Sequence, residues 1–240
     1  MTAADCLRQA LELDTDTGYR SGQADALMHL GAVQQLTGDY PAATTTLRQA
    51  LALSCDLGDR HQQAEVLTGL AAVQRLAGDY RSAAASSQQA IEQLRDLRHR
   101  NGEAYALNEL GLVQQLTGNY AAAAVSHQQA LEIFRDLSDR ENQAEVLNSL
   151  GELSSRTAAS QQARDYHNQA LAIARDLGVP LEEARALEGI GHSHLRDGNP
   201  GEGFARLQQA LGIYQRIGAP DAQRVMDTLG ETASNVSRPS

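Results

Sequence analysis

The sequence has no lysine and no tryptophan, and aromatic residues make up only 4% of its 240 positions. A core without large aromatic side chains must be built mostly from Ala, Leu, Val and Ile, which suits closely packed helices. The two cysteines, Cys6 and Cys55, are too few for a disulfide framework, so free thiols are expected. Because every basic residue is arginine and Ala and Gly are abundant, the composition indicates a GC-rich bacterial genome.

Long apolar runs are also missing. No stretch approaches the roughly 20 apolar residues that a membrane-spanning helix needs. At the N-terminus, Asp5 and Arg8 interrupt any apolar region that could act as a signal peptide. We therefore expect a cytoplasmic protein with no membrane association.

Positive charge is in short supply, with 20 basic against 30 acidic residues and a net charge of −10. Nucleic-acid binding depends on clustered cations that neutralise phosphates, whereas these arginines are scattered and mixed with acids. The charge pattern therefore argues against direct binding of DNA or RNA.

Motifs that carry catalysis are absent as well. There is no G-x-x-x-x-G-K-[ST] phosphate loop, no H-E-x-x-H, no C-x-x-C and no G-x-S-x-G. His192 and His194 lie two positions apart and would point to nearly opposite sides of a helix, so they cannot share a metal ion without outside ligands and are expected to be polar helix surface. We expect no catalytic residue, no metal site and no cofactor, and the protein is not expected to be an enzyme.

What the sequence does contain is one unit repeated every 40 residues. The same phase recurs at Leu30, Leu70, Leu110, Leu150 and Ile190, and a Gln-Ala pair recurs at 9–10, 49–50, 89–90, 129–130, 169–170 and 209–210. A fixed period in this range is typical of a solenoid, in which each unit buries its apolar face against its neighbours.

Each unit is predicted to be a pair of antiparallel helices. In residues 104–137, apolar and small residues keep steps of three and four on both sides of a Gly118-Asn119 turn. Gly111 stands inside the first helix, where glycine costs about 1 kcal/mol relative to alanine. A close approach of the second helix at Ala123 and Ala130 would explain it. His127 and His167 occupy a phase filled elsewhere by leucine, so they are expected to be packing residues with one nitrogen hydrogen-bonded.

The unit resembles a tetratricopeptide repeat. The family order of Leu-Gly, then Gly-x-Tyr, then Ala positions is met by Leu27, Leu30, Gly31, Gly38, Tyr40, Ala43, Leu47 and Ala50. The sequence departs from the family pattern in lacking the Trp, in having Gln for the first Tyr, and in its period of 40 rather than 34 residues. It is similar in this respect to the long-repeat branch, which includes kinesin light chains, Leu-Gly-Asn-repeat polarity adaptors and the C-terminal arrays of bacterial transcription regulators. HEAT and armadillo repeats share the period but lack this order.

The resemblance implies an all-α fold, a right-handed superhelical α-solenoid of about 12 helices. Residues 1–20 are expected to form a half repeat, the second helix only, which indicates either a piece cut from a longer array or a surface for homodimerisation. The other expected parts are five full units at about 21–57, 61–97, 101–137, 141–177 and 181–217, a capping helix at 220–234, and a disordered tail at 235–240. In the fourth unit, Arg156–Ser160 replaces the usual Gly-Asp-Tyr turn, which indicates sequence drift or a local bend.

With no catalytic site expected, function is predicted to reside in a surface. In tetratricopeptide repeats the first helices line a concave groove, and the matching phases there contact a peptide. The predicted partner-binding residues are Asn108, Asn148, Tyr105, Glu109, Gln115, Glu145, Glu152, Arg75, Gln35 and Met28. The asparagines offer donors and an acceptor to a peptide backbone, Tyr105 offers an aromatic anchor, and the glutamates favour a basic rather than an acidic partner.

Two functions are therefore considered. The first is a protein–protein interaction module that binds a peptide or helix of a partner, as the C-terminal regulatory array of a bacterial signalling or transcription regulator. The alternative is a ligand-sensing or self-assembling domain, in which the region around Asn108, Glu109, Asn148 and Glu152 takes a small signal molecule.

Overall fold

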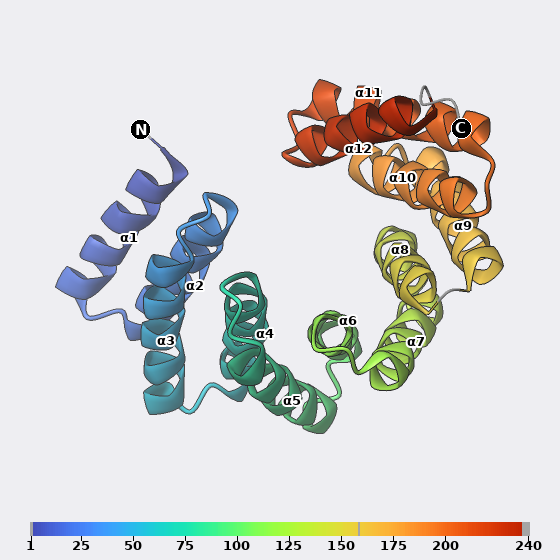
Figure 1. The fold of residues 1–240 in the computed structure, drawn as a ribbon. Coiled ribbons are helices and arrows are strands. Elements are labelled where there is room, and N and C mark those ends of the chain that lie inside the picture. The colour runs from blue at the N-terminus through green and yellow to red at the C-terminus, as the bar shows by residue number, and fades with distance from the viewer. Residues whose placement is uncertain (1, 158, 237–240) are drawn as a thin grey trace. The chain divides into compact units, whose positions relative to one another are not determined.

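The structure is a computed structural model that describes residues 2–157 and 159–236, with side-chain surroundings described as far as residue 230. The described residues form twelve α-helices and contain no strand (Figure 1). The helices are α1 (Ala3–Thr17), α2 (Arg20–Leu36), α3 (Tyr40–Leu57), α4 (Arg60–Leu76), α5 (Tyr80–Asp96), α6 (Arg100–Leu116), α7 (Tyr120–Asp136), α8 (Arg140–Arg156), α9 (Ser160–Leu177), α10 (Pro180–Arg196), α11 (Pro200–Ile217) and α12 (Asp221–Val236). The all-α class and the expected number of helices are confirmed.

The helices pack as consecutive pairs in two compact units, residues 1–130 and 131–240, whose boundary falls within α7. In unit 1, α2 packs on α3 and α4 on α5, and each pair contacts the next through α3–α4 and α5–α6. In unit 2, α8 packs on α9, α9 on α10, α10 on α11 and α11 on α12. First helices also touch one another, as α2–α4 and α4–α6 in unit 1 and α8–α10 in unit 2. Each unit therefore has a face built from first helices.

Aspartates begin many of these helices. Asp39, Asp59, Asp79 and Asp139 each stand at the N-cap, and the side chain accepts a hydrogen bond from the backbone amide three residues later. Such caps satisfy amides that have no partner within the helix. Pro41 and Pro200 lie in the first turns of α3 and α11, where proline is tolerated because the amide it lacks would have no partner within the helix.

Each turn between one 40-residue repeat and the next contains a residue with a left-handed backbone conformation. Glycine supplies it at positions 18, 58, 178 and 218, with φ between 68° and 70°, but Arg98 and Ser138 take the same place in two turns with φ of 55° and 57°. A residue with a Cβ atom in this conformation costs roughly 1–2 kcal/mol. These two turns are therefore strained relative to the glycine turns.

Small residues hold the paired helices together. Ala24, Ala64, Ala104, Ala144 and Ala184 on the first helices are all completely buried. A Cβ atom added at Gly111 would lie 2.6 Å from His127 Cε1, and one at Gly31 would lie 2.6 Å from Leu47 Cγ. The predicted close approach is present, but the side chain that fills the space at Gly111 is His127 rather than Ala123 or Ala130.

The C-terminal helix α12 packs against α11 where the sequence predicts a cap. It runs to Val236, so Asn235 and Val236 are helical, and the rest of the expected tail lies outside the described residues. The altered turn of the fourth unit includes Ala158, which also lies outside them. Within the described part of the chain, no helix is both long and apolar enough to cross a membrane, and both cysteines are exposed free thiols.

Candidate functional site

Unit 1 has a pocket of about 320 Å³ on its first-helix face, lined from α2, α4, α5, α6 and the turn before α6. Two predicted binding residues, Met28 of α2 and Tyr105 of α6, line it together with Thr68 and Gly69 of α4 and Leu94 of α5. Tyr105 is 41% exposed although it is a large aromatic residue. The structure thus gathers Met28 and Tyr105 around one apolar depression.

Acidic and imidazole groups border this pocket. Glu65 lines it and lies 3.7 Å from His61 Nδ1. The His61 ring in turn packs on the His99 ring with centroids 4.7 Å apart. His99 Nδ1 is buried without a hydrogen-bond partner among the described residues. Glu65 is therefore the acidic residue among those that line the pocket, and its carboxylate lies beside the His61 ring.

Two further predicted residues, Arg75 and Glu109, pair with each other. Arg75 Nε donates to Glu109 Oε1, and Arg75 Nη2 lies 3.4 Å from Glu109 Oε2. Gln35 is half-buried on α2, whereas Gln115 is only 5% exposed and its Oε1 has no hydrogen-bond partner among the described residues. Because Arg75 forms an ion pair with Glu109, the charge of Glu109 is neutralised within unit 1.

The two predicted asparagines lie in the interior rather than on an open groove. Asn108 is 5% exposed and its Oδ1 is 2.8 Å from His127 Nδ1, and Asn148 is fully buried with its Oδ1 3.0 Å from His167 Nδ1. The physical reason is the phase: residues 108 and 127 face one another across the helix pair, as do residues 148 and 167. The expectation that these amides are exposed is corrected, and their direct contact with a partner stays a prediction.

The Asn–His pairs fix the state of both histidines. Because the asparagine oxygen can only accept, Nδ1 of each imidazole carries the proton, and Nε2 of His127 and of His167 is buried without a hydrogen-bond partner among the described residues. Burial lowers the pKa of His127 and of His167 from 6.5 to about 4, so both are neutral at pH 7. The prediction that these histidines are packing residues with one bonded nitrogen is confirmed.

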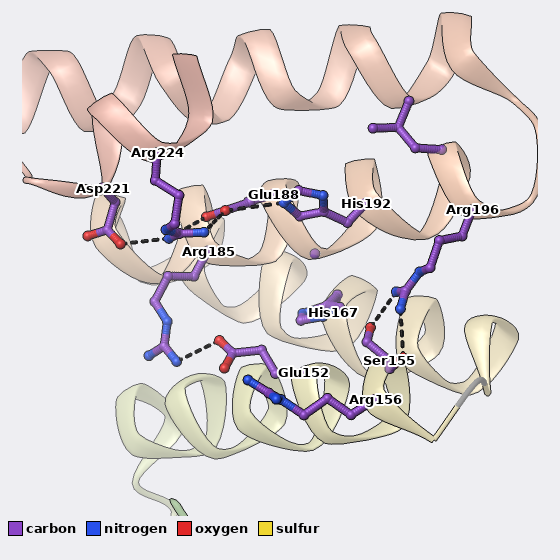
Figure 2. A pocket seen from close by; sticks show the side chains of 12 residues that line it. Glu152, Ser155, Arg156, His167, Arg185, Glu188, His192, Arg196, Asp221 and Arg224 are labelled. Carbon is purple, nitrogen blue, oxygen red and sulfur yellow. Dashed lines mark hydrogen bonds and ion pairs between the residues drawn. The ribbon is translucent and has the colours of Figure 1, made fainter. Parts of the chain in front are cut away.

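Unit 2 has a larger pocket, of about 650 Å³, lined from α8, α9, α10 and α12 (Figure 2). The predicted residue Glu152 lines it and accepts a hydrogen bond from Arg185 Nη2 at 3.0 Å. Burial alone would lower the pKa of Arg185, but the carboxylates of Glu152, Glu182 and Glu145 outweigh burial and raise it. Glu145, another predicted residue, is half-buried near this network.

A second ion-pair group lies on the α12 side of the same pocket. Glu188 of α10 accepts hydrogen bonds from Tyr214 Oη at 3.0 Å and from Arg224 of α12, which also binds Asp221 at 2.7 Å. Burial would raise the pKa of Glu188, but the hydrogen bonds from His192, Arg224 and Tyr214 lower it. Glu188 is therefore a buried carboxylate that fastens α12 to α10.

Sequence reasoning missed the arginines of this pocket, although a signal was present. One position of the 40-residue repeat is leucine in the first three full repeats (Leu36, Leu76 and Leu116) and arginine in the last two (Arg156 and Arg196). Both arginines line the unit 2 pocket. Aligning the units at this phase would have marked the change from leucine to arginine.

The chain belongs to the tetratricopeptide repeat family, whose model matches residues 23–96 and 102–176. Among solved structures it is similar to BtubC (BKLC) from P. vanneervenii, with a TM-score of 0.75 at 20% identity over 91% of this chain and 93% of that one. It is also similar to a signal transduction ATPase with a tetratricopeptide repeat sensor from Pyrococcus horikoshii, with a TM-score of 0.69 at 16% identity over 93% of this chain and 37% of that one.

A third similar structure is a Rap protein complexed with Competence and Sporulation Factor, with a TM-score of 0.67 at 12% identity over 90% of this chain and 64% of that one. At these identities the likeness establishes the fold alone. No curated protein sequence matches the chain. The resemblance to the tetratricopeptide repeat family is thereby confirmed, and the fold is also similar to that of a putative kinesin light chain from Podosopora anserina, with a TM-score of 0.63 at 16% identity over 80% of this chain and 95% of that one.

Proposed function

We propose that this chain is a non-catalytic interaction module, and that the unit 1 pocket binds a partner peptide by accepting one large apolar side chain. The observation that carries this proposal is the pocket of about 320 Å³ between Met28, Gly69 and Tyr105. Exposed aromatic residues beside a concave apolar site are typical anchors of protein–protein interfaces.

Gly69 supports the proposal because no side chain among the described residues packs closely against it. A glycine inside a helix costs about 1 kcal/mol relative to alanine. Gly31, Gly111 and Gly151 each face a side chain within 2.6 Å of an added Cβ atom, but at Gly69 the nearest atom, Leu47 Cδ1, is 3.9 Å away. The space in front of Gly69 is left open on the pocket side, and we assign it to the partner.

The charges at the rim favour a basic residue next to the apolar anchor. Glu65 lines the pocket, and its side chain is 40% exposed. A partner segment that places Arg or Lys beside its apolar side chain would meet the Glu65 carboxylate, whereas an acidic segment would be repelled.

For the biological setting, we propose the C-terminal regulatory array of a bacterial cytoplasmic signalling or transcription regulator. The support is analogy of fold: one structural neighbour carries a tetratricopeptide repeat sensor within a signal transduction ATPase, and another is a Rap protein complexed with a factor. Homodimerisation through residues 1–20 stays a second prediction. It is tested by the mass in solution of a chain lacking those residues, and it fails if the parent chain is already monomeric.

The test fills the pocket without disturbing the helix. In Gly69→Leu the added Cβ atom would have no atom closer than 3.9 Å and the rest of the side chain would extend into the pocket. We expect unchanged or higher thermal stability together with loss of the partner from a lysate capture read by mass spectrometry. Gly212→Leu is the matched control, since Gly212 is also inside a helix and has no atom within 4 Å of an added Cβ.

A peptide array of the captured partner then locates the bound segment. We expect it to contain a large apolar residue flanked by Arg or Lys, and replacement of that basic residue by Glu should abolish binding. Equal capture by the parent chain and Gly69→Leu would refute the pocket, and a bound segment rich in acids would refute the proposed charge preference.

A further inference from the structure

The unit 2 pocket differs from the unit 1 pocket in being lined with arginines. Four of them, Arg156, Arg185, Arg196 and Arg224, stand against three carboxylates, those of Glu152, Glu188 and Asp221. Glu182, which pairs with Arg185, brings the carboxylates to four, so the site is distinguished by how its arginines are paired rather than by a net charge.

Two of the four arginines are already neutralised. Arg185 pairs with Glu152 and Glu182 at 3.0 Å and 3.2 Å. Arg224 pairs with Glu188 and, at 2.7 Å, with Asp221. These pairs connect α8, α10 and α12 and form a fixed wall of the pocket (Figure 2).

The other two arginines have no acidic partner among the described residues. Arg196 of α10 instead donates to Ser155 of α8, from Nη1 to the backbone oxygen at 2.6 Å and from Nη2 to Oγ at 2.7 Å. Arg156 is the next residue of α8, and it is exposed. Arg156 and Arg196 are thus the last residues of two neighbouring first helices, α8 and α10, and both line the pocket.

Arg156 and Arg196 together carry more N–H donors than the hydrogen bonds within the described residues occupy. A guanidinium carries five N–H donors, and the bonds to serine occupy only part of the set on Arg196. Serine also holds the Arg196 side chain in place, which reduces the entropy lost when a ligand binds. Guanidinium groups bind carboxylate and phosphate in a bidentate manner.

We propose that the unit 2 pocket binds a small oxyanion ligand, a carboxylate or phosphate compound of metabolite size, through Arg156 and Arg196. The volume of about 650 Å³ lies within the range of about 300–1,000 Å³ for small-molecule sites. The ligand would join the ends of α8 and α10 and so stiffen two successive repeats. This site lies within unit 2 and is independent of the peptide pocket proposed for unit 1.

The experiment is a titration of the isotope-labelled chain, followed by amide chemical shifts in NMR at constant ionic strength. Inorganic phosphate and citrate serve as separate probes for the two ligand chemistries. We expect saturable shifts for at least one probe, confined to the C-terminal turns of α8 and α10. Binding of phosphate alone would assign a phosphate ligand, and binding of citrate alone a carboxylate ligand.

The variant Arg156→Gln/Arg196→Gln removes both charges and should weaken binding by at least about tenfold, as expected for a lost hydrogen bond to a charged group. Arg216→Gln is the matched control, because Arg216 is also an exposed arginine in the last turn of a helix of unit 2 and should leave binding unchanged. Unchanged thermal stability of both variants would show that the fold is kept. The proposal is overturned if neither probe gives saturable shifts at concentrations up to about 10 mM, which exceeds a weak dissociation constant of about 1 mM. It is also overturned if the double arginine variant binds as the parent does.

Discussion

The Asn148–His167 pair should behave as one energetic unit. Position 148 corresponds to Met28 in the first repeat, and position 167 corresponds to Leu47, and Met28 packs against the cluster that contains Leu47. The same two places thus hold either an apolar pair or a hydrogen-bonded polar pair. A double-mutant cycle tests this, with the single variants Asn148→Met and His167→Leu and the variant that carries both changes.

The single change Asn148→Met should be strongly destabilising. It leaves the buried Nδ1–H of His167 without an acceptor and removes the bonds from Asn148 Nδ2 to Glu182 O at 3.1 Å and to Glu182 Oε2 at 2.8 Å. An unpaired buried donor costs about 1–3 kcal/mol. The Glu182 carboxylate still forms its ion pair with Arg185, so losing the hydrogen bond from Asn148 costs less there than at His167. We expect the free energy of unfolding to fall by about 3 kcal/mol in total.

The double variant should recover most of that loss. His167→Leu alone leaves the Asn148 oxygen buried without a donor, at a cost of about 2 kcal/mol. With both changes no unpaired group remains from the pair, and the unsatisfied Nε2 of His167 disappears as well. We expect the double variant to lie within about 1.5 kcal/mol of the parent, which together with single losses of about 3 and about 2 kcal/mol corresponds to a coupling energy of about 3.5 kcal/mol.

The assay is urea denaturation followed by circular dichroism, with the slope of the transition checked for each variant, since repeat arrays can lose cooperativity. Gln35→Met on the half-buried surface of α2 is the control and should change stability by less than about 0.5 kcal/mol. Additive losses in the double variant, or a loss below about 1 kcal/mol for Asn148→Met, would refute the reasoning.

Three further predictions concern the same packing and turns. Because burial lowers the pKa of His127 and His167 from 6.5 to about 4, unfolding takes up protons below pH 6.5; stability is full above that pH and should fall by about 2 kcal/mol per histidine at pH 5. Urea midpoints at pH 7.5 and 5 measure this, and the loss should shrink in His127→Leu/His167→Leu. Gly111→Ala places a Cβ atom 2.6 Å from His127 and should cost about 1–3 kcal/mol, whereas Gly212→Ala, with open space around it, should stabilise by up to about 1 kcal/mol in the same denaturation assay. Arg98→Gly relieves the positive φ of 55° and should raise the melting temperature, with a net gain of about 0.5–1 kcal/mol after the added chain entropy of glycine is subtracted; an unchanged or lower melting temperature would contradict it.

The helices and their order could be predicted because their causes are local and repeated. The 40-residue period, the Gly-Asp-Tyr turns and the prolines at helix starts act on neighbouring residues of the chain, and repetition removes the ambiguity of any single unit. The packing role of His127 and His167 followed from the same logic, since each stands in the phase of Leu47 and Leu207. For that reason twelve helices and a tetratricopeptide array were predictable before any coordinates.

The exposure of individual polar residues was not predictable in this way. Asn108 and Asn148 lie on the helix face assigned to the groove, yet they are turned inward because a histidine replaces leucine 19 residues later and offers a buried donor. That choice depends on the partner side chain across the helix pair, which a one-helix pattern does not contain.

The sequence by itself determined the all-α repeat and the small residues buried between paired helices, since these depend on spacing and on steric size. Only the tertiary structure decided which polar groups satisfy one another and which are left for a ligand. Arg185 and Arg224 are neutralised by carboxylates on other helices, whereas Arg156 and Arg196 have no acidic partner among the described residues. The physical reason is that an ion pair depends on distances between residues more than 30 positions apart, and only packing of the helices sets those distances.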